Sequence, residues 1–501
     1  MTTSFITTAI PYVIARPHLG FAYELVLADV LARHRRRRGR DVRFITGTDD
    51  NSLKGVTAAA IEGVAPRTFV DRNAAAFRAL VPLLNISVDD FIATSQEPRH
   101  RPAVELLWRR CAASGDLYRK HWTGRYCAGC EAFVDDGIEI CPEHHTAPEP
   151  VSEENWFFRL SRWREPIRDA IASGRLSIVP DSARAETLAF LAGDVHDISI
   201  SRDAARSQGW GIPVPEDPSQ VIWVWFDALT NYLSALGLAD DEAPLARYWT
   251  TGSERVHVIG KGITRFHTVF WPAFLLSAGL PLPDRIAVHG YLTVEGEKIS
   301  KSGRNVEVEP VVNDVGVDAL RWYFARRCRT RTDPDVSRSA IVDAHDGDLA
   351  GGIGNLVQRC IALASKLADG RVPVPRESPD ATALQARATA LPVQVDAALD
   401  AFLLDDAAAA IIGLIDEANR VLERAEPWRL QRSDPTAAAA SLYAPLEAAR
   451  IAAGELAPFV PEVASVIAAR LGTADAEPRW GRLVPGTQLV VGAPPVPRRN
   501  R

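Results

Sequence analysis

The sequence has few of the features that mark secreted, membrane-spanning or strongly basic proteins. Its 501 residues include only six cysteines, too few for a disulfide scaffold in a chain of this length. No apolar stretch approaches the roughly 20 residues needed to span a bilayer, and Met1 to Ser4 lack the positive charge of a signal peptide. The net charge of −6 excludes a generally basic nucleic-acid coat, although not a local basic face. We therefore expect a cytosolic (cytoplasmic) protein with no membrane or DNA partner.

Hydrophobic residues make up 47% of the sequence and charged residues 24%, which is typical of an ordinary globular protein. The length of the chain predicts two or three domains. Short apolar runs alternate with amphipathic ones in residues 1–116 and 151–290, which predicts the two halves of an α/β domain with a doubly wound parallel sheet. Residues 117–150 carry cysteine, proline and glycine and are typical of an insertion. Residues 291–341 form a linking segment with a lysine-bearing loop. Residues 342–501 predict a helical bundle that ends in a tail laid across the surface.

A run of basic residues from Arg33 to Arg38, closed by Gly39, admits two interpretations. Clustered arginines are typical of RNA-binding patches. They are also typical of the last turn of a helix, where cations offset the negative end of the dipole and glycine caps the C-terminus. We favour the structural interpretation because a predicted strand, Asp41 to Thr46, follows at once.

Two short segments far apart in the chain are each suited to phosphate. The first, Pro17-His18-Leu19-Gly20, lies between an apolar run and a helical pattern. A strand, tight loop and helix in this order direct backbone N–H groups at a phosphate. The second, Lys298-Ile299-Ser300-Lys301-Ser302, places two ammonium groups three residues apart, which can stabilise the charge that develops on a pyrophosphate leaving group. We expect loop 298–302 to fold over the helix that begins beside His18.

Together, these segments resemble the HIGH and KMSKS signatures of class I aminoacyl-tRNA synthetases. Other segments recur in the same order in the methionyl-tRNA synthetase family: Ala9-Ile10-Pro11-Tyr12, Phe44 to Lys54, Glu153 to Phe158, Val224 to Ala228, Ile259-Gly260-Lys261, Phe266-His267, Phe270-Trp271-Pro272 and Gly316-Val317-Asp318. The resemblance implies a Rossmann-type catalytic domain with a zinc-bearing connective insertion, followed by an all-α anticodon-binding bundle. The implied activity uses ATP with Mg²⁺ to convert L-methionine to methionyl-adenylate and then transfers the methionyl group to methionine tRNA.

The resemblance also assigns residues to the nucleotide. His18, Lys298 and Lys301 match catalytic positions, and Gly20, Ser300, Ser302 and Gly260 match positions that bind the cofactor. Three departures from the family pattern lie near the same site: Phe21 replaces the second histidine of the first signature, Asn51-Ser52 replace His-Gly, and Gly262 replaces an aspartate. Loss of one preorganised donor at Phe21 is expected to cost on the order of 3 kcal/mol, about a hundredfold in rate.

The amino-acid pocket implied by the resemblance is more complete. Asp49 is the expected partner of the substrate ammonium, through a charge-assisted hydrogen bond. The positions that wrap the thioether are Ile10, Tyr12, Trp225, Ala228, Tyr232, Ile263, His267 and Trp271. Aromatic walls suit a soft sulfur, to which Tyr232 and His267 could offer weak hydrogen bonds. One change is visible, since Leu229 stands where some family members have proline.

Cys127-Ala128-Gly129-Cys130 followed by Cys141-Pro142-Glu143-His144 predicts a metal site. Two pairs at this spacing can close a tetrahedral site of three cysteines and one histidine around one structural Zn²⁺. His145 competes with His144 as the fourth ligand, and the spacing favours His144. The other cysteines, Cys111, Cys328 and Cys360, are predicted to be core residues.

Three residues of the predicted bundle match family positions that recognise the methionine anticodon. Asn355 and Arg359 are four residues apart and share one helical face. Trp428 follows a proline at a helix end and can stack on an unpaired base. We therefore expect tRNA as a partner.

Two other hypotheses remain open. The altered nucleotide-site residues motivate a paralogue that delivers an activated amino acid to a small-molecule acceptor or acts as a drug-tolerant second isozyme. A non-catalytic tRNA-binding protein is a further alternative. The lysines of loop 298–302 speak against it, because a pure binder has no need of phosphate ligands.

Overall fold

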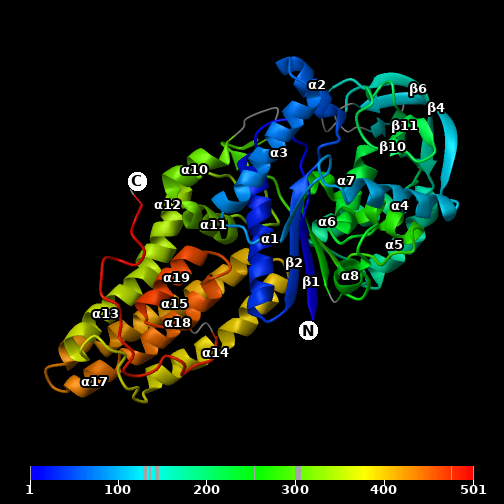
Figure 1. The fold of residues 1–501 in the computed structure, drawn as a ribbon. Helices are drawn as coiled ribbons and strands as arrows, with labels where there is room; N and C mark the ends of the chain where they lie inside the picture. The colour runs from blue at the N-terminus through cyan, green and yellow to red at the C-terminus, as the bar shows by residue number, and fades with distance from the viewer. Residues whose placement is uncertain are drawn as a thin grey trace. The chain divides into compact units, whose positions relative to one another are not determined.

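The computed structural model divides into two units, one built on a parallel sheet and one largely helical (Figure 1). The sheet unit consists of Met1–Pro17, Arg38–Val81 and Val88–Val288, and the helical unit of His18–Arg37, Pro82–Ser87 and His289–Arg501. The structure describes residues 2–127, 132–134, 137–141, 146–252, 254–299, 306–474 and 477–499. The helix that follows His18 thus groups with the C-terminal half of the chain.

The sheet unit contains the predicted doubly wound sheet, with strand order β3-β2-β1-β12-β13-β7. Its strands are β1 (Thr3–Thr8), β2 (Asp41–Thr48), β3 (Asp90–Ala93), β7 (Ser177–Val179), β12 (Arg255–Gly260) and β13 (Arg285–His289). β1 pairs in parallel with both β2 and β12. The strand order therefore reverses between β1 and β12, and the carboxyl ends of strands at such a point form the usual ligand crevice of these folds.

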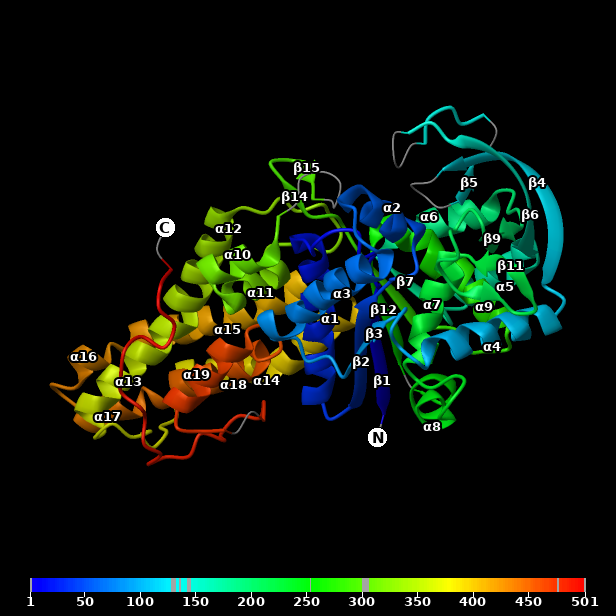
Figure 2. The same cartoon turned by 45° about the horizontal axis from the view of Figure 1, so that its top comes forward.

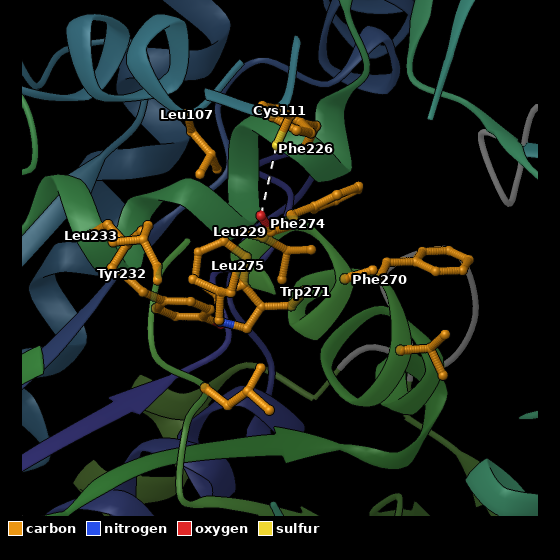
Figure 3. Packing of buried hydrophobic residues seen from close by; sticks show 14 of the residues in the cluster. Leu107, Cys111, Phe226, Leu229, Tyr232, Leu233, Phe270, Trp271, Phe274 and Leu275 are labelled. Carbon is orange, nitrogen blue, oxygen red and sulfur yellow. Dashed lines mark hydrogen bonds between the residues drawn. The ribbon is translucent and has the colours of Figure 1, made fainter. Parts of the chain in front are cut away.

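The helices of this unit bury a continuous apolar core. They are α2 (Leu53–Glu62), α3 (Pro66–Leu83), α4 (His100–Ala113), α5 (Leu160–Ala172), α6 (Asp181–Ala192), α7 (Val224–Ser234), α8 (Glu242–Leu245) and α9 (Trp271–Ser277), with single turns η1 (Ala246–Thr250), η2 (Lys261–Ile263) and η3 (Phe266–Phe270). Figure 3 shows α4, α7 and α9 meeting through aromatic and aliphatic side chains. The Cys111 Sγ lies 3.7 Å from the Phe274 carbonyl oxygen, which confirms Cys111 as a core residue.

The predicted insertion, residues 117–150, lies within a group of antiparallel strands that extends as far as Ile222, beyond the predicted bounds. β4 (Leu117–Cys127) pairs along its length with β6 (Glu149–Phe158), and the sheet order is β5-β4-β6-β8, with β5 (Ala132–Val134) and β8 (Ile198–Ser199). β9 (Ser201–Asp203), β10 (Pro213–Val214) and β11 (Asp217–Ile222) form a second small sheet. Figure 2 shows β4 and β6 as two long curved ribbons.

The helical unit confirms the predicted all-α C-terminal half. Its helices are α1 (Leu19–Arg37), α10 (Val308–Val315), α11 (Val317–Arg326), α12 (Arg338–Ala344), η4 (His345–Gly354), α13 (Asn355–Leu367), α14 (Pro379–Asp400), α15 (Leu404–Ala425), α16 (Pro427–Leu430), α17 (Pro435–Ala440), α18 (Tyr443–Leu456) and α19 (Pro461–Arg470). α14, α15 and α18 lie side by side (Figure 1). Apolar residues at helical spacing explain this packing. In α15, Ile411, Ile415 and Leu422 are buried, whereas most of the charged residues of the helix, such as Asp416 and Arg420, are exposed.

The basic run at the end of α1 serves the fold. Arg33 pairs with Asp29 at 2.7 Å, and the His34 Nε2 lies 2.8 Å from an Asp396 carboxylate oxygen. Arg35 pairs with Asp400 on the same neighbouring helix, α14. These bonds confirm the structural interpretation, because Arg33 pairs within α1, and His34 and Arg35 bond to acidic residues of α14 in the same unit.

The C-terminal tail lies across its own unit, as predicted. Gln358 donates to the Gly492 carbonyl oxygen at 3.3 Å, and the backbone N–H of Arg499 donates to the Asp346 carboxylate at 2.9 Å.

Cys328 and Cys360 are fully buried, which confirms them as core residues. In the described part of the chain, no helix combines the length and apolar character that a membrane crossing requires.

Candidate functional site: an amino-acid pocket and two phosphate-facing segments

The carboxyl ends of β1 and β2 bring Tyr12 and Asp49 together. The two residues form an isolated parallel bridge, and the Asp49 N–H donates to the Pro11 carbonyl oxygen at 3.0 Å. Asp49 is only 3% exposed, and one of its carboxylate oxygens accepts from the Asn51 N–H at 3.3 Å. A buried carboxylate at the carboxyl end of β2, next to the strand-order reversal, is well placed to accept from an ammonium group.

Helix α7 supplies one wall of aromatic side chains. Trp225, Ala228 and Tyr232 are spaced by three and four residues, so they share one face of the helix. The Trp225 ring meets the edge of Tyr12 at a centroid distance of 6.2 Å and stacks on Phe266 at 3.6 Å. The predicted residues Tyr12, Asp49 and Trp225 are therefore neighbours.

Tyr232 and His267 form a second, fully buried part of the site. Burial lowers the pKa of His267 to about 4, so the ring is neutral at pH 7. Its Nδ1 lies 3.0 Å from the Ile263 carbonyl oxygen, which can only accept, so Nδ1 carries the proton. Its Nε2 therefore accepts from the Tyr232 hydroxyl at 2.8 Å. Both protons that were expected to face sulfur are engaged within the chain.

Trp271 completes this part of the cluster. Its ring lies 5.9 Å from that of Tyr232, and Figure 3 shows the two rings beside each other. The contacts thus connect most of the predicted pocket, while Ile10 lies just beyond the end of β1 and is half-buried. Leu229, at the proline position, is buried in the core of Figure 3.

Four residues that contact or position the predicted site residues were not predicted from the sequence. They are His257, Asp227, His100 and Phe266. His257, on β12, contacts both Tyr232 and Trp271. Asp227, in the first turn of α7, accepts from the Asn51 amide at 2.8 Å and is bonded to His100 at 2.5 Å. Phe266 covers Trp225. A lone histidine in an apolar strand carries no signal of its own, but Phe266 and Asp227 lie in segments that the family resemblance covers.

Charge is disfavoured in this part of the sheet unit. Burial raises the pKa of Asp50 to about 6, even though the Ser95 hydroxyl donates to its carboxylate at 3.0 Å. Asn51, where the family has histidine, donates to Asp227, and Ser52 caps α2 by accepting from the Lys54 N–H. Both departures thus have a defined structural role in this chain.

In the helical unit, His18 directly precedes α1 and Gly20 lies in the first turn of that helix. The Gly20 N–H donates to the His18 Nδ1 at 3.1 Å, so a neutral ring carries its proton on Nε2 and can donate it outward. A Cβ on residue 20 would lie 2.9 Å from two ring atoms of His18, which explains the glycine. Phe21 is 7% exposed and packs into the unit.

Lys298 lies on a short hairpin of the same unit. β14 (Thr293–Val294) pairs antiparallel with β15 (Glu297–Lys298), and the Lys298 ammonium lies 3.4 Å from the centroid of the Tyr291 ring. Ser300, Lys301 and Ser302 lie outside the described residues. The chain that follows pairs with the start of α1: the Leu19 N–H donates to the Val306 carbonyl oxygen at 3.0 Å, and His18 forms a bridge with Glu307. The segment that follows the loop thus pairs with the start of α1, whereas the position of loop 298–302 itself stays a prediction.

The remaining nucleotide positions lie at the carboxyl end of β12. Gly260 is the last residue of that strand, and Gly262 is exposed in the turn η2. This is the sheet edge at which Tyr12 and Asp49 also lie, so Gly260 belongs with the pocket residues of the sheet unit.

The structure describes two of the four predicted zinc ligands, Cys127 and Cys141. Cys127 is the last residue of β4, Cys141 lies between β5 and β6 in the sequence, and each is 1% exposed. Cys130, His144 and His145 lie outside the described residues. Within the described ranges, no group of three or more histidine, cysteine or acidic residues is placed to hold a metal.

The three predicted tRNA-binding residues lie in the helical unit. Asn355 is exposed at the start of α13, and the Arg359 guanidinium lies 5.9 Å from the centroid of the Trp428 ring. Arg359 also approaches Glu423 at 3.4 Å. Arginine beside an aromatic ring on a half-exposed surface can bind a backbone phosphate and a base together.

Comparison with known families covers nearly the whole chain. The family of class I tRNA synthetases (M) matches residues 4–149 and 141–361, and the anticodon binding domain of methionyl tRNA ligase matches residues 372–489. A methionine--tRNA ligase from Rhizobium meliloti is 40% identical over 99% of this chain and 98% of its own length. One from Mycobacterium bovis is also 40% identical, over 98% and 96%.

Solved structures agree with this assignment. Mycobacterium tuberculosis methionyl-tRNA synthetase in complex with methionyl-adenylate aligns with a TM-score of 0.93 and 39% identity, over 99% of this chain and 100% of that chain. The apo form of the same synthetase aligns with a TM-score of 0.88 and 36% identity, over 100% and 99%. The present chain therefore belongs to the methionine--tRNA ligases, a family of class I tRNA synthetases.

Proposed function

We propose that this chain is a methionine--tRNA ligase that activates L-methionine with ATP and transfers the methionyl group to methionine tRNA. The observation that carries the proposal is the buried carboxylate of Asp49 beside Tyr12 and Trp225, at the carboxyl ends of the sheet, in a member of this family that aligns over nearly the whole length of its relatives. Asp49 would bind the substrate ammonium. The ring faces of Trp225, Tyr232 and Trp271 would receive the thioether, because a polarizable sulfur packs well against aromatic rings.

In the first step, the methionine carboxylate attacks the α-phosphorus of ATP, forming methionyl-adenylate and releasing pyrophosphate. The His18 Nε2–H would donate to the phosphates, held in that tautomer by the Gly20 N–H. Lys298 and Lys301 would stabilise the charge that accumulates on the departing pyrophosphate. ATP bound with Mg²⁺ would supply the electrophilic phosphorus, and Ser300, Ser302 and Gly260 would line its site.

In the second step, the 3′-terminal hydroxyl of tRNA attacks the activated carbonyl and releases AMP. The match of residues 372–489 to the anticodon binding domain supports tRNA as the partner. Asn355, Arg359 and Trp428 would read the anticodon, because the half-exposed ring and the neighbouring guanidinium suit an unpaired base.

We further propose one structural Zn²⁺ held by Cys127, Cys130, Cys141 and His144. The two described thiols are buried although much of β4 is exposed, which fits a pair of thiolate ligands. Zinc bound there would stiffen the predicted insertion, residues 117–150. Metal analysis should find one zinc per chain, lost in Cys127→Ser and retained in Cys111→Ala. His144→Ala compared with His145→Ala would identify the fourth ligand, and unchanged zinc in Cys127→Ser would refute the set.

Methionine-dependent exchange of pyrophosphate into ATP tests the proposed function. Exchange with charging of methionine tRNA supports it. The departures at Phe21, Asn51, Ser52 and Gly262 favour one alternative, a paralogue with a small-molecule acceptor, which would show exchange without charging. A non-catalytic tRNA-binding protein would show neither reaction while still binding tRNA.

A further inference from the structure

A buried histidine and a buried carboxylate join helix α4 to helix α7 beside the proposed pocket. His100 is the first residue of α4 and Asp227 lies in the first turn of α7, and they are 0% and 1% exposed. The His100 Nε2 lies 2.5 Å from one carboxylate oxygen of Asp227, and its Nδ1 lies 2.9 Å from the Ser234 hydroxyl oxygen. Both nitrogens of the ring therefore have a partner on α7.

The second carboxylate oxygen of Asp227 contacts the segment that carries the proposed ammonium ligand. It accepts from the Asn51 side-chain amide at 2.8 Å. An amide group donates only through its nitrogen, so this bond determines which way round the Asn51 amide lies. The backbone N–H of the same residue donates to the Asp49 carboxylate at 3.3 Å. Asn51 thus links the buried pair to the carboxylate of Asp49.

Stability alone does not account for the pair of His100 and Asp227. Removing a carboxylate from water costs free energy, and apolar residues in place of such buried pairs often leave a protein equally stable. Each oxygen of Asp227 accepts from a different residue, so its carboxylate is held in one orientation. That carboxylate in turn holds the side chain of Asn51, which is half-buried between β2 and α2.

We propose that His100, acting through Asp227 and Asn51, is a positioning residue that orients the carboxylate for the substrate ammonium. This inference deepens the proposed function and rests on it. With the Asn51 N–H bound to one of its oxygens, the Asp49 carboxylate is oriented before the substrate arrives, so less conformational freedom is lost on binding. An asparagine performs this task at the position where the family pattern has histidine.

Three ligands distinguish this orienting role from general support of the fold. Methionine and methioninol both carry the ammonium group, whereas 4-(methylthio)butanoate has the side chain and carboxylate of methionine without the nitrogen. His100→Leu cannot donate to Asp227. In calorimetric titrations, its affinities for methionine and methioninol should fall about fivefold to tenfold, because a charge-assisted bond to the ammonium is weakened. Its affinity for 4-(methylthio)butanoate should stay within about twofold of the wild type.

His100→Gln is the matched control, because its amide nitrogen lies near the position of Nε2 and can donate to Asp227. It should recover most of the affinity for the two ammonium ligands. Asn51→Ala leaves the buried pair in place and should reproduce the loss seen in His100→Leu. Combining these two changes should cause little further loss, because both interrupt the same series of bonds. Thermal unfolding shows which variants are folded.

Equal losses for all three ligands in folded His100→Leu would overturn the proposal, because the ring would then support the pocket as a whole. Unchanged affinities in that variant, or fully additive losses when Asn51→Ala is combined with it, would overturn the proposal as well. If His100→Leu does not fold, Asn51→Ala decides the matter. A loss confined to the ammonium ligands supports the role of His100, and the absence of such a loss overturns it.

The wild-type protein separates this inference from the proposed function. Absence of methionine-dependent pyrophosphate exchange would overturn the proposed function, while the titrations still test His100 in a protein that binds methionine. A wild type that exchanges pyrophosphate, with variants that bind the three ligands as it does, would overturn the role of His100 alone. A wild type that binds none of the three ligands would overturn both.

Discussion

The aromatic cluster of the sheet unit and the β14–β15 hairpin of the helical unit, which carries Lys298, differ in the charge state that they favour. In the pocket, burial shifts ionisable groups toward their neutral forms: the pKa values of His257 and His267 are lowered and that of Asp50 is raised. On the hairpin, Lys298 is exposed and its ammonium rests on an aromatic face. The aromatic cluster therefore favours neutral groups, whereas Lys298 retains an exposed charge, which fits the proposed roles of binding an uncharged side chain and a phosphate.

The largest effect is expected on the hairpin. Lys298→Ala should lower kcat for pyrophosphate exchange by roughly 10²–10³-fold, because a charge aimed at the transition state is removed. The KM for methionine should change little, since the pocket is untouched. Glu297→Ala, the exposed neighbour on β15, is the matched control and should retain full activity. A loss that appears only in the KM for methionine would contradict the separation of the two regions.

The second prediction concerns the donor missing at Phe21. Phe21 lies in the first turn of α1, and its backbone N–H donates to the carbonyl oxygen of His18, the residue that precedes the helix, at 3.0 Å. Phe21→His should raise the rate of adenylate formation up to about a hundredfold, because it restores one preorganised donor. Single-turnover measurements with saturating substrates would detect the gain.

Phe21→Leu provides the control for this change, because it keeps an apolar side chain and adds no donor. Phe21 is buried, so the histidine variant must first be shown to unfold at a temperature close to that of the wild type. A folded Phe21→His variant with unchanged rate would mean that another group already serves the phosphates.

Asp50 tests whether the pocket region penalises charge. Its pKa in the folded protein, about 6, lies above the ordinary value of 3.8. The protonated form is therefore favoured by folding, and its stabilising contribution is lost as the pH rises from about 4 through 6. The stability of the wild type relative to Asp50→Asn should fall by about 2–3 kcal/mol between pH 4 and pH 7.

Denaturant unfolding at several pH values measures this difference. His267 acts in the opposite direction, because a lowered histidine pKa reduces stability as the pH falls from 6.5 toward 4. It is present in both proteins, so its effect cancels in the difference. If the difference in unfolding free energy between the two proteins did not change with pH, burial would not raise the pKa of Asp50.

Much of the fold was accessible from the sequence because local patterns report directly on it. The alternation in residues 1–116 predicted the parallel strands, and the stripe of apolar residues in α15 predicted a bundle. The basic run after Arg33 was correctly interpreted because helix ends favour cations. The grouping of α1 with the C-terminal half was not foreseen, since it depends on contacts such as Asp29 with Arg321 that are distant in sequence.

The candidate site was predicted unevenly for the same reason. Tyr12, Asp49 and Trp225 were named from their motifs, and they are neighbours. His257 was missed because its role arises from two partners, Tyr232 and Trp271, that approach it only in the folded chain. The engagement of the Tyr232 hydroxyl by His267 was likewise hidden, because a tautomer follows from hydrogen-bond geometry and not from residue identity.

The smallest effect is expected for Trp428, because its proposed role is to bind tRNA and it takes no part in adenylate formation. Trp428→Ala should raise the KM for tRNA in charging roughly tenfold, because one stacked base contributes about 1–3 kcal/mol. Pyrophosphate exchange requires no tRNA and should not change. Trp428→Phe keeps a ring beside Arg359 and should lose less. Normal charging by Trp428→Ala would remove this residue from the tRNA surface, whereas equal losses of exchange and charging would mean that the ring supports the fold instead.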